Sequence, residues 1–262
     1  MSLYKNDLFE HVKIAVNSIL EQTYKTDLFL YCDGPLNDDV IAYLTRLDLE
    51  PNVFIYKSDV NNGLAYALNF LIDTVLIEGY RYIARMDSDD ISHPSRIFNQ
   101  VKHLEINPHI DVLGTSCKEF GADFALEIKS LPKNHDELYK FSVVRCPFIH
   151  PTVIFRSKVF NDGHRYPTTT LLTEDMALWH RLLLSGYKFE NLDLVLLEYR
   201  INSNTLYRRK GIKKFASELK TRYSFMIQSN QFTLELLFIL ILKCSISLTP
   251  SFLTKVLYKY FR

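Results

Sequence analysis

The side chains best suited to chemistry are three aspartates within four positions, Asp87, Asp89 and Asp90, and a separate aspartate, Asp33, before a Gly-Pro turn. Carboxylates this close together repel one another unless a cation or ordered hydrogen-bond donors compensate their charge. Carboxylate oxygens on a tight loop suit Mg²⁺ or Mn²⁺, which proteins usually hold with one or two carboxylates plus substrate phosphates. The acidic group therefore predicts a divalent-metal site, and the alternative interpretation is an acidic surface turn or helix cap.

A second acidic pair, Glu174–Asp175, opens an expected helix. The helix dipole favours negative charge there, so one interpretation is a simple N-terminal cap assisted by Thr173. In the other interpretation, one carboxylate acts as a general base toward an acceptor hydroxyl. His150, just before Pro151, fits a ligand, a phosphate contact or a turn residue, and the remaining histidines show no metal-ligand spacing such as HExxH.

Short apolar runs alternate with helical patterns around these acids. Strands are predicted at 28–32, 53–56 and 82–86, and helices at 7–22, with Asn6 or Asp7 as its cap, at 37–47, from 63 and from 94 to about 106. Asp33 and the Asp87 group directly follow the first and third strands. This alternation predicts an α/β fold with a mostly parallel sheet, in which ligands bind beyond the carboxyl ends of the strands.

The second half of the chain is less regular. It predicts strands at 111–115, 124–128, 152–155 and 192–199, and helices at 136–144 and 174–184. From about Tyr207 basic residues gather, followed by an apolar segment from Phe232 and a helix that starts at Pro250. The basic residues of this stretch are Arg208, Arg209, Lys210, Lys213, Lys214, Lys220 and Arg222, with Lys255, Lys259 and Arg262 at the end.

Composition excludes several classes of protein. The 262 residues are 47% hydrophobic and 23% charged, which is typical of a folded chain. With a net charge of +1, the chain lacks the excess of basic residues that is typical of a nucleic-acid binder. The four cysteines form no CxxC pair and are expected to be reduced. Without a signal peptide, and with no apolar run near the roughly 20 residues that span a bilayer, we expect a cytoplasmic protein.

Several blocks of the sequence, in order, resemble one family. The most specific block is IARMDSDDIS at 83–92, and the others lie at 18–24, 31–35, 61–64, 146–152 and 173–179. Over about residues 1–205 they resemble the inverting glycosyltransferases of family 2. The branch is similar to the bacterial sugar transferases of capsule, exopolysaccharide and O-antigen synthesis. The resemblance implies a GT-A fold, a Rossmann-like nucleotide-sugar-binding domain over 1–205, with a basic, amphipathic helical tail over 206–262.

The resemblance also implies roles for individual residues. Asp87 and Asp89 would hold Mn²⁺ or Mg²⁺ against the donor diphosphate, and Asp33 would contact the uracil of a UDP-sugar. Asp175 would be the catalytic base, with Glu174 as the fallback candidate. Further donor or acceptor contacts would come from Tyr4, Asn61, Arg85, Asp87 and His150.

The implied activity is inverting transfer of a sugar from a UDP-sugar to a hydroxyl of a saccharide acceptor, lipid-linked in this branch, during surface polysaccharide synthesis. The tail would lie on the inner face of the cell membrane, the alternative being that its helices simply pack on the catalytic domain. Two other functions stay open: a Mg²⁺-dependent nucleotidyltransferase or phosphohydrolase, and an inactive, truncated transferase-like binding protein.

Two features depart from the family pattern. Cys32 stands where many relatives have another aspartate, so one donor contact is expected to be lost or replaced. Residues 1–6 resemble the end of the family's first strand, so we expect this central strand to be short.

Overall fold

The computed structural model describes residues 1–170, 172–201 and 211–249. Its strands are β1 (Ser2–Leu3), β2 (Leu28–Asp33), β3 (Val53–Ser58), β4 (Tyr82–Ala84), β5 (Ile91–Ser92), β6 (Val112–Phe120), β7 (Ile154–Arg156) and β8 (Phe189–Arg200). Its α-helices are α1 (Phe9–Leu20), α2 (Asp38–Leu47), α3 (Leu64–Ile77), α4 (Arg96–Ile106), α5 (His135–Phe141), α6 (Lys158–Asn161), α7 (Glu174–Leu184), α9 (Ile212–Gln228) and α10 (Leu234–Ser245). Short 3₁₀ turns cover His150–Thr152 and Ile246–Leu248.

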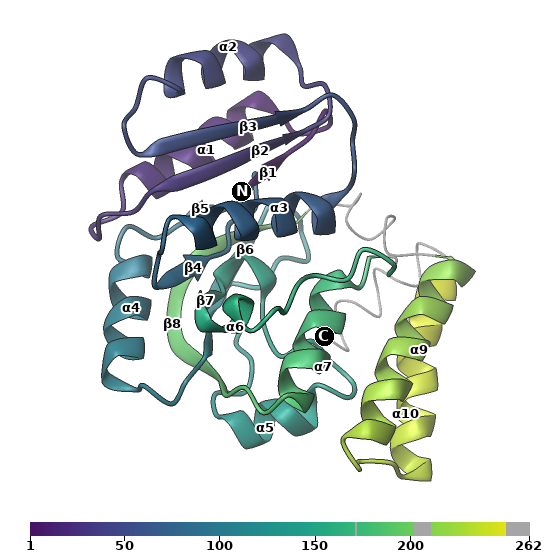
Figure 1. The fold of residues 1–262 in the computed structure, drawn as a ribbon. Coiled ribbons are helices and arrows are strands. Elements are labelled where there is room, and N and C mark those ends of the chain that lie inside the picture. Colours follow the sequence, from purple (N-terminus) through teal and green to yellow (C-terminus); the bar gives the residue numbers. More distant parts are fainter. Residues whose placement is uncertain (171, 202–210, 250–262) are drawn as a thin grey trace.

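The strands form two sheets (Figure 1). β1, β2 and β3 are parallel and neighbour one another in that order. The second sheet is mixed, in the order β4-β7-β6-β8-β5, with β6 and β8 parallel and the other pairs antiparallel. The α/β class expected from the sequence is therefore confirmed.

β2 is the most deeply buried strand of the first sheet, because all six of its positions are covered. Leu28, Leu30 and Cys32 pack in one core cluster with side chains of α1 and α2. Phe29 and Tyr31 point to the opposite face and pack with side chains of α3. An uninterrupted apolar run suits this position, since a strand between two helical layers has no solvent face.

β1 is as short as the sequence predicts. Ser2 pairs with Tyr31 of β2, Leu3 pairs with Cys32, and the amino group of Met1 donates to the Phe29 carbonyl at 2.7 Å. Between β2 and β4 lies a mainly apolar cavity of about 330 Å³. Its lining includes Leu28, Phe29, Tyr82, Ile83 and Ala84.

One predicted strand, at 124–128, is wrong. The chain instead extends β6 to Phe120, turns, and returns with a single bridge between Cys117 and Lys129. On the edge of β6 away from β8, the returning segment adds only one backbone hydrogen bond beside this bridge, from the Glu119 N–H to the Leu126 carbonyl at 2.8 Å, so 124–128 does not form a further strand.

The two C-terminal helices α9 and α10 lie side by side next to α7 (Figure 1). Their side chains Phe225, Met226, Leu240 and Cys244 belong to the same core cluster as Trp179 of α7. The described part of the tail is therefore packed on the rest of the fold. Tyr207, Arg208, Arg209 and Lys210, and the segment from Pro250 with Lys255, Lys259 and Arg262, lie outside the described residues. Within residues 1–170, 172–201 and 211–249, none of the helices has the length and apolar character to cross a bilayer.

Candidate functional site

The acidic loop follows β4 directly, as expected. The carboxylate of Asp87 accepts a hydrogen bond from the guanidinium of Arg85, which is buried. The same guanidinium donates to the Met86 carbonyl at 3.1 Å. Arg85 therefore fixes the backbone and the first carboxylate of the loop together, and it is a structural partner of a predicted metal ligand.

Asp90 is fully buried behind this loop. Its Oδ1 accepts from the Arg200 backbone N–H at 2.8 Å, while Oδ2 has no hydrogen-bond partner. Burial raises the pKa of Asp90 well above its usual range, and the negative charges of Asp87 and Asp89 raise it further. The buried guanidinium of Arg96 opposes this effect from the side of α4. The third aspartate of the group is thus part of the core under the loop.

A further carboxylate, Asp7, joins the acidic loop from the start of the chain. Its Oδ2 accepts from the backbone N–H of Tyr4 at 3.0 Å. Burial raises the pKa of Asp7 to about 6, and the charges of Asp89 and Asp87 contribute to the rise. The sequence pattern indicated Asp7 only as a helix cap, whereas α1 begins after Leu8, and nothing in its spacing signalled the proximity to Asp89.

The oxygen-rich loop fits a divalent cation. Among the residues that the structure describes, no three His, Cys, Asp or Glu side chains form a ready metal cluster. Mg²⁺ or Mn²⁺ held by one or two carboxylates and by donor phosphates does not require one. The Oδ2 of Asp90 has no hydrogen-bond partner, and the charges of Asp87 and Asp89 add to the effect of burial that raises the pKa values of Asp7 and Asp90, so carboxyl groups are concentrated around the loop. Asp87 and Asp89 are the loop carboxylates that fit such an ion.

The second acidic pair opens α7. Asp175 Oδ1 accepts from the backbone N–H of Met176 at 2.7 Å. Burial raises the pKa of Glu174, and the adjacent charge of Asp175 adds to the increase. Thr173 occupies the N-cap position but makes no capping bond, because its hydroxyl instead bonds the hydroxyl of Ser217 on α9 at 3.2 Å. The expected assistance from Thr173 to the helix start is therefore absent.

A buried network lies between the two acidic groups. His150 Nε2 accepts from Arg85 Nε at 3.2 Å and lies 2.9 Å from the hydroxyl of Tyr166. Burial, with the charge of Arg85, holds the pKa of His150 well below its usual value, so the imidazole is neutral. Since Arg85 only donates, the imidazole proton must be on Nδ1.

Tyr166 connects the two acidic groups electrostatically. Burial raises the pKa of its phenol; the charge of Arg85 lowers it, and those of Asp175, Asp87 and Glu174 raise it. Both acidic groups therefore act on one buried phenol. No sequence pattern indicated Tyr166, because its contact with His150 depends on the path of the loop after α6.

Asp33 and Asn61 form a separate cluster at the end of β2. Asp33 is buried, and its two oxygens accept from the backbone N–H groups of Asn62 at 2.7 Å and Gly63 at 2.9 Å. Gly34 has a φ of +86°, and a Cβ there would come within 3.0 Å of the Asn61 nitrogen. Asp33 thus shapes the turn that starts α3 and keeps Asn61 close to the strand end.

Known proteins resemble this chain along most of its length. Residues 4–215 match the model of Glycosyl transferase family 2. The amylovoran biosynthesis glycosyltransferase AmsE of Erwinia amylovora is 31% identical over 84% of this chain and 82% of its own. The UDP-Gal:alpha-D-GlcNAc-diphosphoundecaprenol beta-1,3-galactosyltransferase of Escherichia coli is 29% identical over 86% of this chain and 81% of its own.

Solved structures show the same fold at low identity. TarS of S. aureus in complex with UDP-GlcNAc matches with a TM-score of 0.63 at 14% identity, over 95% of this chain and 73% of that chain. The mannosyltransferase PcManGT of Pyrobaculum calidifontis, in complex with GDP-Man and Mn²⁺, matches with a TM-score of 0.61 at 13% identity, over 99% and 86%. These matches confirm the GT-A-type α/β fold.

Proposed function

Because the chain belongs to glycosyl transferase family 2, we propose that it transfers a sugar from a UDP-sugar to a hydroxyl of a lipid-linked saccharide in bacterial surface polysaccharide synthesis. The activities for which two relatives are named support this proposal: one acts in amylovoran biosynthesis, and the other uses UDP-Gal and a diphosphoundecaprenol-linked sugar. The observation that carries it is the buried chain of contacts from Asp87 through Arg85 and His150 to the phenol of Tyr166, which lies between the two acidic groups. A donor diphosphate and an acceptor hydroxyl need two such groups close together.

The donor would lie against the acidic loop. A divalent cation at Asp87 and Asp89, when bound, would neutralise negative charge on the UDP leaving group. Arg85 holds Asp87 in place through its guanidinium, and His150 accepts from the same guanidinium. Asp33 is the proposed uracil contact, beside the turn that it holds through Asn62 and Gly63. Asn61, which lies beside the Gly34 turn, and Tyr4, whose backbone N–H donates to Asp7, are proposed as further donor contacts.

The acceptor would lie against the start of α7. In the proposed step, the carboxylate of Asp175 takes the proton of the acceptor hydroxyl as its oxygen bonds to the anomeric carbon. The bond from that carbon to the diphosphate oxygen breaks, and UDP leaves with the electron pair. Attack from the face opposite the leaving group inverts the anomeric configuration, so no covalent enzyme intermediate forms. Glu174 is the fallback base.

We also propose that the tail touches the inner face of the cell membrane. On α10 the side chains of Leu234, Phe238 and Leu242 are 78%, 62% and 55% exposed and recur every four residues along one face. An apolar helix face of this kind suits the headgroup boundary of a bilayer. Lys214 and Arg222 are buried against the protein, so these two basic residues are not available to anionic lipid.

The proposal is tested with Asp175→Asn, with Asp136→Asn as the matched control because Asp136 is an exposed acid in the first turn of α5. UDP affinity is measured by calorimetry with Mn²⁺, and transfer is measured from a panel of UDP-sugars to synthetic lipid-diphosphate sugars. Asp175→Asn should keep its UDP affinity and lose about 10²- to 10⁴-fold in turnover. A variant that loses UDP affinity but keeps its saturated turnover refutes the base assignment. A wild-type protein that neither binds UDP nor consumes any UDP-sugar refutes the donor class.

A further inference from the structure

The two residues before the Glu174–Asp175 pair have an unusual backbone. Leu172 has a φ of +52°, and in the described part of the chain only Asn230 shares a positive φ among non-glycine residues. A branched side chain adopts this left-handed region only where the surrounding structure holds it there. Thr173, the next residue, is buried and does not cap its own helix. The turn that precedes the Glu174–Asp175 pair therefore depends on contacts from outside α7.

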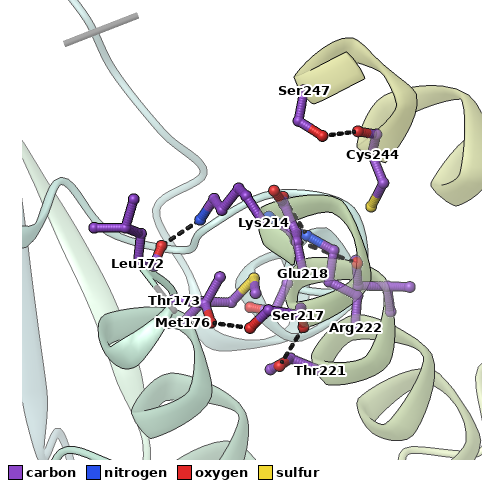
Figure 2. Close-up of polar contacts among 12 residues, drawn as sticks. Leu172, Thr173, Met176, Lys214, Ser217, Glu218, Thr221, Arg222, Cys244 and Ser247 are labelled. Carbon is purple, nitrogen blue, oxygen red and sulfur yellow. Dashed lines mark hydrogen bonds and ion pairs between the residues drawn. The ribbon is translucent and has the colours of Figure 1, made fainter. Parts of the chain in front are cut away.

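Those contacts come from the tail helix α9, as Figure 2 shows. The Nζ of Lys214 donates to the Leu172 carbonyl, and the hydroxyls of Ser217 and Thr173 lie 3.2 Å apart. Lys214 and Ser217 are three positions apart, so they lie on the same face of α9. Both residues of the strained turn are thus held by adjacent side chains of one helix.

α9 is itself firmly placed. Arg222 is buried, its Nε lies 2.9 Å from Glu218 Oε1, and its Nη1 donates to the Val143 carbonyl at 3.3 Å. Phe225 and Met226 of the same helix are part of the main core cluster. A contact from α9 therefore fixes the turn relative to the core.

Lys214 also brings a positive charge to the acidic pair. Burial and Asp175 raise the pKa of Glu174, and the charge of Lys214 opposes this rise. Among the residues that the structure describes, the charged or titratable groups that interact with Glu174 are Asp175 on its own helix, Lys214 on α9 and the Tyr166 phenol.

We propose that Lys214 is a positioning residue for the Glu174–Asp175 pair, which makes the tail helix α9 part of the catalytic apparatus. This inference rests on the proposed transferase function. The ammonium of Lys214 donates to the Leu172 carbonyl and so holds the strained turn in place. The turn thereby fixes where the two carboxylates lie relative to the acceptor, and the charge of Lys214 favours the ionised form of Glu174. A misplacement of a base by about 1 Å is enough to slow a reaction by roughly 100-fold.

The test replaces Lys214 with methionine, which keeps the length of the stem and removes the donor and the charge. Lys213→Met is the matched control, because Lys213 is the adjacent lysine of α9 and is exposed. In Lys214→Met we expect turnover to fall about 10- to 100-fold with an unchanged KM for the UDP-sugar. The pKa of Glu174 should rise in Lys214→Met and not in Lys213→Met, because the cation that opposes the effects of burial and of Asp175 is gone; a carboxyl NMR titration of the two variants would show this. Lys214→Arg should restore part of the turnover.

A second measurement does not depend on activity. The backbone N–H of Ala177 donates to the Thr173 carbonyl at 2.9 Å, so its hydrogen exchange reports the start of α7. We expect faster exchange at Ala177 in Lys214→Met and wild-type exchange in Lys213→Met. Thr173→Val, which removes only the hydroxyl contact with Ser217, serves if Lys214→Met does not fold, and it should show the same acceleration.

Wild-type exchange at Ala177 in Lys214→Met and Thr173→Val overturns the inference, and so does a loss of turnover in Lys213→Met equal to that in Lys214→Met. If the wild-type protein transfers no sugar, the proposed function fails, while the exchange result still decides whether α9 holds the turn.

Discussion

Replacing Arg222 with methionine should loosen the C-terminal helices from the rest of the protein. Arg222 is only 3% exposed, and its guanidinium contacts the Glu218 carboxylate at 2.9 Å and the Val143 carbonyl at 3.3 Å. Burial alone would raise the pKa of Glu218, yet Arg222 and Lys214 together hold it below its usual value. Without Arg222, a largely buried carboxylate loses its main partner. Removing one member of a buried pair costs about 3–5 kcal/mol, and since Lys214 remains nearby we expect about 3 kcal/mol.

The assay is urea unfolding followed by circular dichroism at pH 7. Lys220→Met, an exposed basic residue on the same helix, is the control and should stay within about 0.5 kcal/mol of wild type. The double variant Glu218→Leu/Arg222→Met should recover part of the loss, because both buried charges are then removed.

The stability that Arg222 contributes should depend on pH. A carboxyl whose folded pKa is lowered contributes stability above its unfolded pKa of about 4.5 and loses that contribution as the pH falls through the folded pKa. The difference between wild type and Arg222→Met should therefore shrink in acid. An Arg222→Met variant as stable as the Lys220→Met control at pH 7 would refute the docking of α9 through this ion pair.

Three further predictions concern the metal, the acid stability and the membrane. The Asp87→Asn and Asp89→Asn variants should fold normally and lose donor turnover by orders of magnitude, because the diphosphate charge loses its counterion. Full turnover of these variants in the presence of EDTA would contradict the metal role. Burial lowers the folded pKa of His180 from 6.5 to about 3, so the unfolded chain binds more protons between these values and stability falls as the pH drops below 6.5. At pH 5 the free energy of unfolding should be about 2 kcal/mol lower for this reason, and His180→Gln should reduce the loss, as urea unfolding at several pH values would show. An unchanged dependence of the unfolding free energy on pH in the variant would contradict the lowered pKa of His180. The protein should sediment with anionic liposomes and Phe238→Ser/Leu242→Ser should not; equal partitioning of the two proteins would leave α10 without a lipid contact.

The strand ends and their acids could be predicted because their signals are local. An apolar run followed by Asp33 or by the Asp87 group marks a buried strand and the edge of a sheet where ligands bind. The hydrogen bonds from Asn62 and Gly63 to Asp33 could not be predicted, because they join positions 29 and 30 residues apart.

The tail shows a second limit. Lys213 and Lys214 are adjacent and look alike in a basic cluster, yet Lys213 is exposed and Lys214 is buried. Which lysine faces α7 depends on the rotation of α9 about its axis, and that rotation is fixed by the packing of Phe225 and Met226. Composition shows where the charge is, whereas burial decides whether it meets lipid or protein.

The proposed donor contacts are divided between the two sheets. No strand pairing joins them anywhere in the described ranges, and β2 faces β4 across the apolar cavity. Asp33 ends a strand of one sheet, and Asp87 follows a strand of the other. Side-chain packing resists sliding less than a continuous ladder of backbone hydrogen bonds does. The proposed uracil and diphosphate contacts therefore belong to two sheets that are joined by side-chain packing and by hydrogen bonds from α1 and the turn after it to β5, not by strand pairing. A bound donor would add a direct link between the two sheets.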